Sequence, residues 1–279
     1  LLSVINKNLP EELKNNMINR YVEPFVGGGA VLFDIISKYK FEQIIINDYN
    51  EELINLYMHI RSEVEDIIYE LKKISDIYFS LNEEERANCF YKMREQFNKT
   101  KSNTIEKSVL FIFLNKTCFN GLYRVNSKGE FNVPYGKYKS PTILDKDNLH
   151  NVSEILSNVT ILKGDFSIVE EYVDDKTFVY FDPPYRPLST TSNFTSYAKN
   201  DFNDKEQERL ADFFKKLNNK DAKLMLSNSD PKNINIEDNF FDELYNNPGF
   251  NIKRVDAKRS INSKGNGRGK ITELLITNY

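Results

Sequence analysis

The chain has 279 residues, of which 28% are charged, and these values are typical of one globular domain or of one domain with a sizeable insertion. Its two cysteines, Cys89 and Cys118, lie far apart and form no metal-binding or disulfide pattern. This spacing argues against a disulfide framework and a cysteine zinc site, and a reducing compartment fits. The longest apolar stretch, residues 109–114, is too short to cross a membrane.

The net charge of −3 argues by itself against a nucleic-acid partner. Two stretches are nevertheless basic. Residues 115–146 hold six Lys or Arg against two acidic residues, and residues 253–270 hold seven against one. Such stretches can bind phosphates, although on charge alone two solvated loops are the simpler interpretation.

The chain begins with an alternation of strand and helix patterns. Residues 20–25 are an apolar run that ends in glycines, which predicts a strand that enters a turn. Apolar residues at helical spacing predict a helix over 30–39. An isoleucine-rich run over 41–46 predicts a second strand, which ends at Asn47 and Asp48.

The middle of the chain breaks this alternation. The pattern is helical from residue 51 to about 114, most clearly over 51–71 and 83–97. Residues 115–140 hold glycines and prolines among aromatic and basic residues, which indicates loop and hairpin structure. We therefore predict that residues 56–150 are an insertion.

Strand patterns return after the insertion. A helix is expected at 205–217, and strands are expected at 159–162, 178–181, 224–226, 252–257 and 274–277. The glycine-rich link 263–269 joins the last two strands and predicts a hairpin. Alternating strands and helices predict an α/β domain with a mainly parallel sheet covered on both faces, formed by residues 1–55 and 151–279.

The turn after the first strand reads Glu-Pro-Phe-Val-Gly-Gly-Gly-Ala over residues 23–30. Glycines let the chain turn sharply and let a ligand approach the backbone. Asp48 lies 19 residues after Gly29, where nucleotide-binding α/β folds place an acid that accepts hydrogen bonds from ribose. The glycines do not follow G-x-G-x-x-G, and a turn without a ligand is the alternative. The pattern favours an adenosine-containing cofactor without choosing one.

The strongest signal is Asp182-Pro183-Pro184-Tyr185, which directly follows the predicted strand 178–181. A carboxylate here stands at the end of a buried strand, where open α/β sheets bind ligands. The prolines fix the backbone and remove two amide donors, so the Pro183 carbonyl becomes a rigid acceptor. Asp182 and this carbonyl can accept both hydrogens of a planar amine on which Tyr185 stacks. The alternative is a rigid turn without a function.

With these motifs the chain resembles the adenine-specific DNA methyltransferases of the Dam and DpnII-type group. The resemblance also covers Asn-Gly-Leu-Tyr-Arg at 120–124, Gly-Glu-Phe-Asn-Val-Pro-Tyr-Gly at 129–136 and Asn-Phe-Thr-Ser-Tyr at 193–197. It implies a Rossmann-like class I methyltransferase fold. The expected sheet is seven-stranded and mainly parallel with an antiparallel last hairpin, and a helical and β-hairpin target-recognition domain is inserted. It also implies transfer of a methyl group from S-adenosylmethionine to adenine N6 in double-stranded DNA, within GATC and without a metal.

The resemblance assigns a cofactor site to two parts of the chain. Asp165 and Phe166 would hold the adenine of the cofactor, although from the residues alone Asp165 fits a helix N-cap equally well. Asp48 would bind the ribose. The remaining residues of the expected pocket are Glu23, Pro24, Phe25, Gly27, Gly28 and Asp182.

The resemblance also assigns the residues that read DNA. Arg124 would contact the first G of the site, worth about 1–3 kcal/mol of discrimination. Phe119 and Asn120 would enter the gap left by a flipped adenine, and Leu122 and Pro134 would contact neighbouring bases. Packing inside the hairpin is the alternative for Phe119 and Leu122. The other expected DNA contacts are Lys137, Lys139, Asn193, Lys258, Arg259 and Arg268.

Members of this group begin with a Lys-Trp-x-Gly-Gly-Lys segment, and nothing in the chain matches it. We expect the segment to precede Leu1, and the alternative is a protein that lacks it and binds the cofactor differently. The resemblance further implies a monomeric, cytoplasmic and nucleoid-associated enzyme of a bacterium or phage, with no membrane partner and a restriction endonuclease as genetic partner. Methylation of cytosine N4 or of adenine in RNA, and a non-catalytic DNA-binding module, are the alternatives. Asp rather than Ser before Pro-Pro favours adenine, and the lack of a Pro-Cys dipeptide excludes the usual cytosine-carbon nucleophile.

Overall fold

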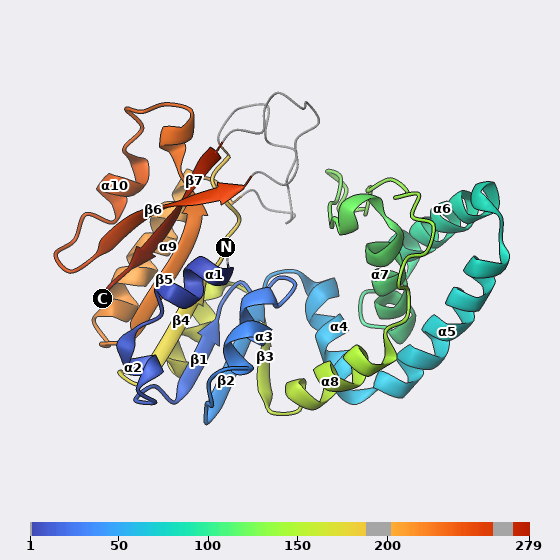
Figure 1. Ribbon diagram of the computed structural model, residues 1–279, viewed down its shortest axis with the longest axis horizontal. Helices are drawn as coiled ribbons and strands as arrows, with labels where there is room; N and C mark the ends of the chain where they lie inside the picture. Colours follow the sequence, from blue (N-terminus) through green and yellow to red (C-terminus); the bar gives the residue numbers. More distant parts are fainter. Residues whose placement is uncertain (1, 188–201, 259–269) are drawn as a thin grey trace. The chain divides into compact units, whose positions relative to one another are not determined.

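The computed structural model describes residues 2–187, 202–258 and 270–279 (Figure 1). Asn193, Arg259, Arg268 and the predicted link 263–269 therefore lie outside the described residues. The chain forms two compact units. In the described residues the first unit holds 2–48, 164–187, 202–258 and 270–279, and the second holds 49–163. No helix among the described residues is long and apolar enough to span a membrane.

A seven-stranded sheet has the order β3-β2-β1-β4-β5-β7-β6 (Figure 1). β1 pairs in parallel with β2 and β4, β4 pairs in parallel with β5, and β7 is antiparallel to both β5 and β6. This confirms the predicted mainly parallel sheet with a final antiparallel hairpin. The strands are β1 (Arg20–Glu23), β2 (Gln43–Asp48), β3 (Val159–Lys163), β4 (Thr177–Phe181), β5 (Lys223–Ser229), β6 (Asn251–Lys258) and β7 (Lys270–Thr277).

The centre of the sheet explains where a ligand can bind. All five residues of β4 are buried, as expected for a parallel strand covered on both faces. In the sheet β1 lies between β2 and β4. The chain passes from β1 to β2 and then to β3 on one side, and it returns to the other side of β1 with β4. The strand order therefore reverses between β1 and β4. In open α/β sheets the crevice for a ligand lies at this point, beyond the carboxyl ends of the strands.

The helices of the first unit are α1 (Leu2–Lys7), α2 (Glu11–Lys14), α3 (Ala30–Ile36), η2 (Phe166–Tyr172), α9 (Asp204–Asn218), η3 (Pro231–Asn233) and α10 (Phe240–Leu244). The helix predicted over 30–39 ends three residues early, at Ile36. α9 agrees with the prediction to within one residue at each end. Its N-terminus is fixed by Asn203, whose side chain accepts hydrogen bonds from the amides of Lys205 and Glu206.

The second unit holds α4 (Glu51–Ser62), α5 (Val64–Ser80), α6 (Glu83–Lys99), α7 (Ile105–Thr117), η1 (Phe119–Gly121) and α8 (Lys146–Leu156). The helical pattern over 51–71 is two helices, because Glu63 leaves the helical conformation at φ −140. In place of a regular hairpin ladder, 115–140 folds back through two isolated antiparallel bridges, Cys118 with Tyr135 and Val125 with Phe131.

Candidate active site

Acidic side chains follow four strands of the sheet. Glu23 ends β1, Asp48 ends β2, Asp165 comes two residues after β3 and Asp182 follows β4 directly. Glu23 lies close enough to Asp182 and Asp48 for their charges to raise its pKa. This edge of the sheet therefore gathers carboxyl groups beside the reversal between β1 and β4, and those that are ionised stabilise a cation there.

Glu23 is almost completely buried, with 2% of its surface exposed. Burial raises the pKa of Glu23 well above its usual range, and the nearby acids raise it further. The Tyr21 hydroxyl donates a hydrogen bond of 2.7 Å to the Glu23 carboxyl, which opposes the rise. The balance favours the neutral form of Glu23.

The glycine turn after β1 is tied to the end of β2. Gly27 has φ +47, and its amide donates a hydrogen bond of 2.9 Å to the Asp48 carboxylate. A Cβ added to Gly27 or to Gly28 would meet no atom within 4 Å. The backbone of the turn therefore borders open space, so a ligand can approach it as the sequence predicts.

Asn47 is a supporting residue that the sequence analysis missed. It is buried, and its side-chain amide donates to the carbonyls of Pro24 at 2.9 Å and Gly164 at 3.1 Å. It thereby joins the loops that follow β1 and β3. The only sequence signal was its place beside Asp48 at a strand end.

Asp165 caps η2 by accepting the Ser167 amide at 3.0 Å, which confirms the N-cap interpretation. Arg209 of α9 donates two hydrogen bonds to the same carboxylate, at 2.9 Å and 2.6 Å. Hydrogen bonding from Arg209 lowers the pKa of Asp165 to about 2, so the carboxylate is charged at neutral pH. No sequence motif had indicated Arg209.

Aromatic rings pack between the glycine turn and η2. Phe166 is buried, and its ring centre lies 5.4 Å from that of Phe25 and 5.5 Å from that of Phe213. Phe25 is half-buried and also contacts Phe202 edge-on. Because Phe166 is enclosed by these rings, Phe25 offers the more accessible aromatic surface. The cofactor contacts of both residues stay predictions.

The Asp182 side chain is exposed to solvent, whereas Pro183 is buried and Tyr185 is half-buried. Partial loss of hydration, followed by the charge of Glu273, raises the pKa of Asp182 to about 7, although a hydrogen bond from Tyr185 lowers it. Both protonation states of the Asp182 carboxyl are therefore accessible near neutral pH. This suits a group that must meet a ligand and exchange a proton near neutral pH.

Arg186 anchors the chain directly after this turn. Its guanidinium donates to Asp204 at 2.8 Å and 3.0 Å and to Asp238 at 2.8 Å, and it lies 4.2 Å from the centre of the Phe240 ring. Bidentate pairs of this kind fix geometry as well as adding energy. The turn is thereby connected to the start of α9 and to the segment before α10.

In the second unit, the residues predicted to read DNA differ in exposure. Arg124 and Leu122 are half-buried, and the exposed residues are Phe119, Asn120, Pro134, Lys137 and Lys139. The Asn132 side-chain oxygen accepts a hydrogen bond of 2.7 Å from Arg124 Nε, and the Asn132 carbonyl accepts one of 3.3 Å from Nη2. Asn132 therefore sets the direction of the Arg124 guanidinium.

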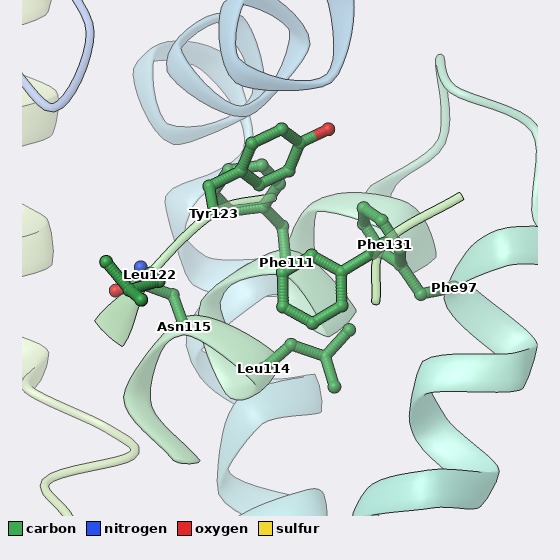
Figure 2. A pocket seen from close by; sticks show the side chains of 7 residues that line it. All are labelled: Phe97, Phe111, Leu114, Asn115, Leu122, Tyr123 and Phe131. Atoms are coloured by element: carbon green, nitrogen blue, oxygen red, sulfur yellow. The ribbon is translucent and has the colours of Figure 1, made fainter. Parts of the chain in front are cut away.

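Leu122 lines an apolar pocket of the second unit together with aromatic side chains (Figure 2). Phe119 is 48% exposed, so its alternative interpretation as hairpin core is wrong. Side chains of α6 hold the returning segment. Arg94 donates to the Val133 carbonyl at 3.1 Å, and Asn98 exchanges two hydrogen bonds with the Phe131 backbone, at 2.8 Å and 3.1 Å.

The second basic stretch is partly used inside the protein. Arg254 of β6 donates to Asp230 at 3.1 Å and to Asp242 at 3.0 Å and 2.7 Å. Lys253 donates to the Asn8 side chain at 2.9 Å. These two residues therefore stabilise the fold, and the charge count overstated what this stretch can offer to phosphates.

Comparison with known proteins agrees with this arrangement. Residues 1–261 match the family of D12 class N6 adenine-specific DNA methyltransferases. The chain is 56% identical to the type II methyltransferase M.MjaIII of Methanocaldococcus jannaschii, over 100% of the chain and 95% of that protein. It is 39% identical to M1.LlaDCHI of Lactococcus lactis (100% and 91%) and 33% identical to the DNA adenine methylase of Escherichia coli K12 (99% and 90%). The chain belongs to the D12 class N6 adenine-specific DNA methyltransferases, enzymes that methylate adenine in DNA.

Proposed function

We propose that this enzyme transfers the methyl group of S-adenosylmethionine to adenine N6 within GATC sites of duplex DNA. Residues 1–55 and 151–279 form the catalytic domain, and 56–150 form the target-recognition domain. The observation that carries the proposal is the position of Asp182, which follows β4 where the strand order reverses and beside the glycine-lined end of β1.

The residues present fit this cofactor. The open backbone at Gly27 and Gly28 admits a ligand, and the Asp48 carboxylate at the end of β2 suits ribose hydroxyls. When bound, S-adenosylmethionine supplies a methyl group on a positively charged sulfur, which the acidic edge complements. The proposed pocket is formed by Glu23, Pro24, Phe25, Gly27, Gly28, Asp48, Asp165, Phe166 and Asp182.

The turn 182–185 provides the groups that handle the target amine. Asp182 and the Pro183 carbonyl accept its two hydrogens, Pro184 keeps the backbone rigid, and Tyr185 stacks on the base. As the adenine nitrogen forms its bond to the methyl carbon, the Asp182 carboxylate accepts one of the two N–H protons. An adenine inside a duplex cannot reach such a pocket, so the base flips out of the helix.

Sequence recognition belongs to the second unit. Arg124, held by Asn132, contacts the first G of the site. Phe119 and Asn120 fill the gap left by the flipped base. The other proposed contacts are Leu122 and Pro134 to bases and Lys137 and Lys139 to phosphates. The likeness of 120–124 and 129–136 to GATC-specific enzymes supports the proposed site.

We further propose that the enzyme acts as a monomer at the nucleoid and is paired with a restriction endonuclease, as two relatives named type II methyltransferases suggest.

The test uses labelled S-adenosylmethionine and two duplexes that differ only by GATC against GTTC. We expect label on adenine in the GATC duplex alone. Asp182→Ala should abolish transfer, while Asp212→Ala, which changes an exposed acid of α9, should not. Label on cytosine, or equal labelling of both duplexes, would contradict the proposal.

A further inference from the structure

Two buried amide side chains lie behind the turn 182–185. Gln207 comes from α9 and Asn228 from β5, and their exposed fractions are 1% and 0%. The Asn228 side-chain nitrogen donates a hydrogen bond of 3.0 Å to the Gln207 side-chain oxygen. Buried amides are costly unless their hydrogen bonds are satisfied, so the partners of this pair show what it holds.

Both amides bind the backbone of the turn. The Gln207 side-chain nitrogen donates to the Pro184 carbonyl at 3.0 Å, and the Arg186 amide donates to the Asn228 side-chain oxygen at 3.1 Å. The two contacts fall on the residues immediately before and after Tyr185. The pair therefore fixes the backbone on both sides of the proposed stacking ring.

The sequence of the turn explains why this support comes from side chains. Pro183 and Pro184 have no amide hydrogen, so they cannot anchor the turn by donating to a neighbouring strand. The contact with Gln207 directs the Pro184 carbonyl into the protein. The Ser229 hydroxyl also donates to the Arg186 carbonyl at 2.7 Å, which holds the far side of the turn on β5.

We propose that Gln207 and Asn228 are positioning residues, which set the Tyr185 ring and the Asp182 carboxylate in place for methyl transfer. The inference rests on the function proposed for 182–185. Both residues act through the backbone and touch no substrate. Because a displacement of about 1 Å can cost about 100-fold in rate, loss of either contact should act on kcat.

Two nearly isosteric variants test the pair, one through its contact with Pro184 and the other through the hydrogen bond between the two amides. Gln207→Glu keeps the acceptor for Asn228 but loses the donor to Pro184, and Asn228→Asp keeps the acceptor for the Arg186 amide but loses the donor to Gln207. Each should lower kcat by about 10- to 100-fold, with the KM for cofactor and for DNA within about twofold of wild type. Wild type is assayed first, since a failure to methylate adenine there refutes the proposed function rather than the role of this pair.

A pH profile provides a readout that a purely structural role would not move. Burial raises the pKa of a carboxyl, and a protonated carboxyl can again donate to the Pro184 carbonyl. The activity of Gln207→Glu relative to wild type should therefore rise as the pH falls. The activity of Gln207→Leu relative to wild type should be the same at every pH. With 2-aminopurine in place of the target base, the fluorescence of the DNA complex should differ from that of wild type in Gln207→Glu and in Asn228→Asp. The affinity of both variants for DNA should be unchanged.

The matched control is a second amide pair at the other end of α9, where Asn278 donates to Asn218 at 2.8 Å. Asn278→Asp keeps the acceptor for the Leu224 amide but loses the donor to Asn218 and to the Ala222 carbonyl, so it should lower the melting temperature without lowering kcat. The inference is overturned if Gln207→Glu and Asn228→Asp keep wild-type kcat. It is also overturned if the losses of kcat in Gln207→Glu and Asn228→Asp are independent of pH and equal that of Asn278→Asp at the same loss of melting temperature.

Discussion

Arg209 holds Asp165 with two hydrogen bonds of 2.9 Å and 2.6 Å, and its guanidinium lies 4.1 Å from the centre of the Phe166 ring. A residue of α9 thus orients both residues proposed to receive the adenine of the cofactor. The bidentate geometry requires a guanidinium, since an ammonium group can form only one such contact in the same direction.

Arg209→Lys should therefore weaken cofactor binding. We expect the KM for S-adenosylmethionine to rise about fivefold to tenfold, or about 1 kcal/mol for a partly exposed pair, with kcat within twofold. Initial rates at varied cofactor concentration measure both constants. The control is Lys216→Ala, which changes the same helix as Arg209 and removes a 2.8 Å ion pair with Glu170 of η2. An unchanged KM in Arg209→Lys argues against the role of Arg209.

The protonation of Asp182 should control the rate near neutral pH. In the proposed mechanism the carboxylate form of Asp182 accepts the amine hydrogens, and the pKa of Asp182 is raised to about 7. The kcat/KM for cofactor should therefore increase as the pH rises through about 7 and then level off. A cation bound beside Asp182 favours its charged form, so the kcat profile should be displaced to lower pH. A flat kcat/KM between pH 6 and 8 refutes this assignment.

The same raised pKa predicts a stability cost at the active site. Folded Asp182 binds its proton more tightly than unfolded Asp182, so its contribution to stability falls as the pH rises from about 4 to about 7. Asp182→Asn has no titrating carboxyl at this position, so it removes this loss of stability at high pH. The variant should melt at a higher temperature than wild type at pH 8, and the difference should shrink toward pH 4. Thermal unfolding at both pH values measures it, and a variant that melts lower at pH 8 contradicts the argument.

Gly28→Ala should affect ligand binding without affecting folding. A Cβ at this position meets no protein atom within 4 Å, so the unfolding temperature should stay within a degree or two of wild type. The methyl would instead occupy space proposed for the cofactor, and affinity measured by calorimetry should fall. Gly136→Ala gives the opposite pattern, because its Cβ would lie 2.6 Å from the Cys118 carbonyl oxygen and should destabilise the second unit.

Base discrimination should depend on Asn132 as well as on Arg124. Arg124→Ala should reduce discrimination at the first G by about 1–3 kcal/mol. Asn132→Ala leaves the guanidinium in place but removes the 2.7 Å contact that directs it, so discrimination should fall by less. Methylation rates on duplexes substituted at this base give both values. Equal rates for wild type and Arg124→Ala on every duplex would exclude base reading by Arg124.

The fold could be predicted from the sequence where local pattern and tertiary structure agree. β4 is a continuous apolar run because both of its faces are covered, and its end marks Asp182. The break at Glu63 could not be predicted, since apolar spacing continues through it. The returning segment after Phe119 does not form a regular hairpin, and side chains of α6 such as Arg94 and Asn98 hold it instead.

The candidate site divides in the same way. Residues that follow a strand or turn, such as Asp48 and Asp182, could be identified from the sequence because their positions depend on local sequence. Gln207, Arg209 and Asn228 were not. They belong to an ordinary amphipathic helix and a buried strand, and their partners lie from 21 to 44 residues away along the chain. Only the folded structure brings them to the loops that they support.

The position of β7 has a consequence for synthesis. β7 is the last strand in the chain, yet it lies between β5 and β6 and pairs with both. β6 can therefore join the sheet only after residues 270–277 have left the ribosome. Until then, β5 presents an unpaired edge to solvent, and a nascent chain stalled before residue 270 should be prone to aggregation and to capture by chaperones.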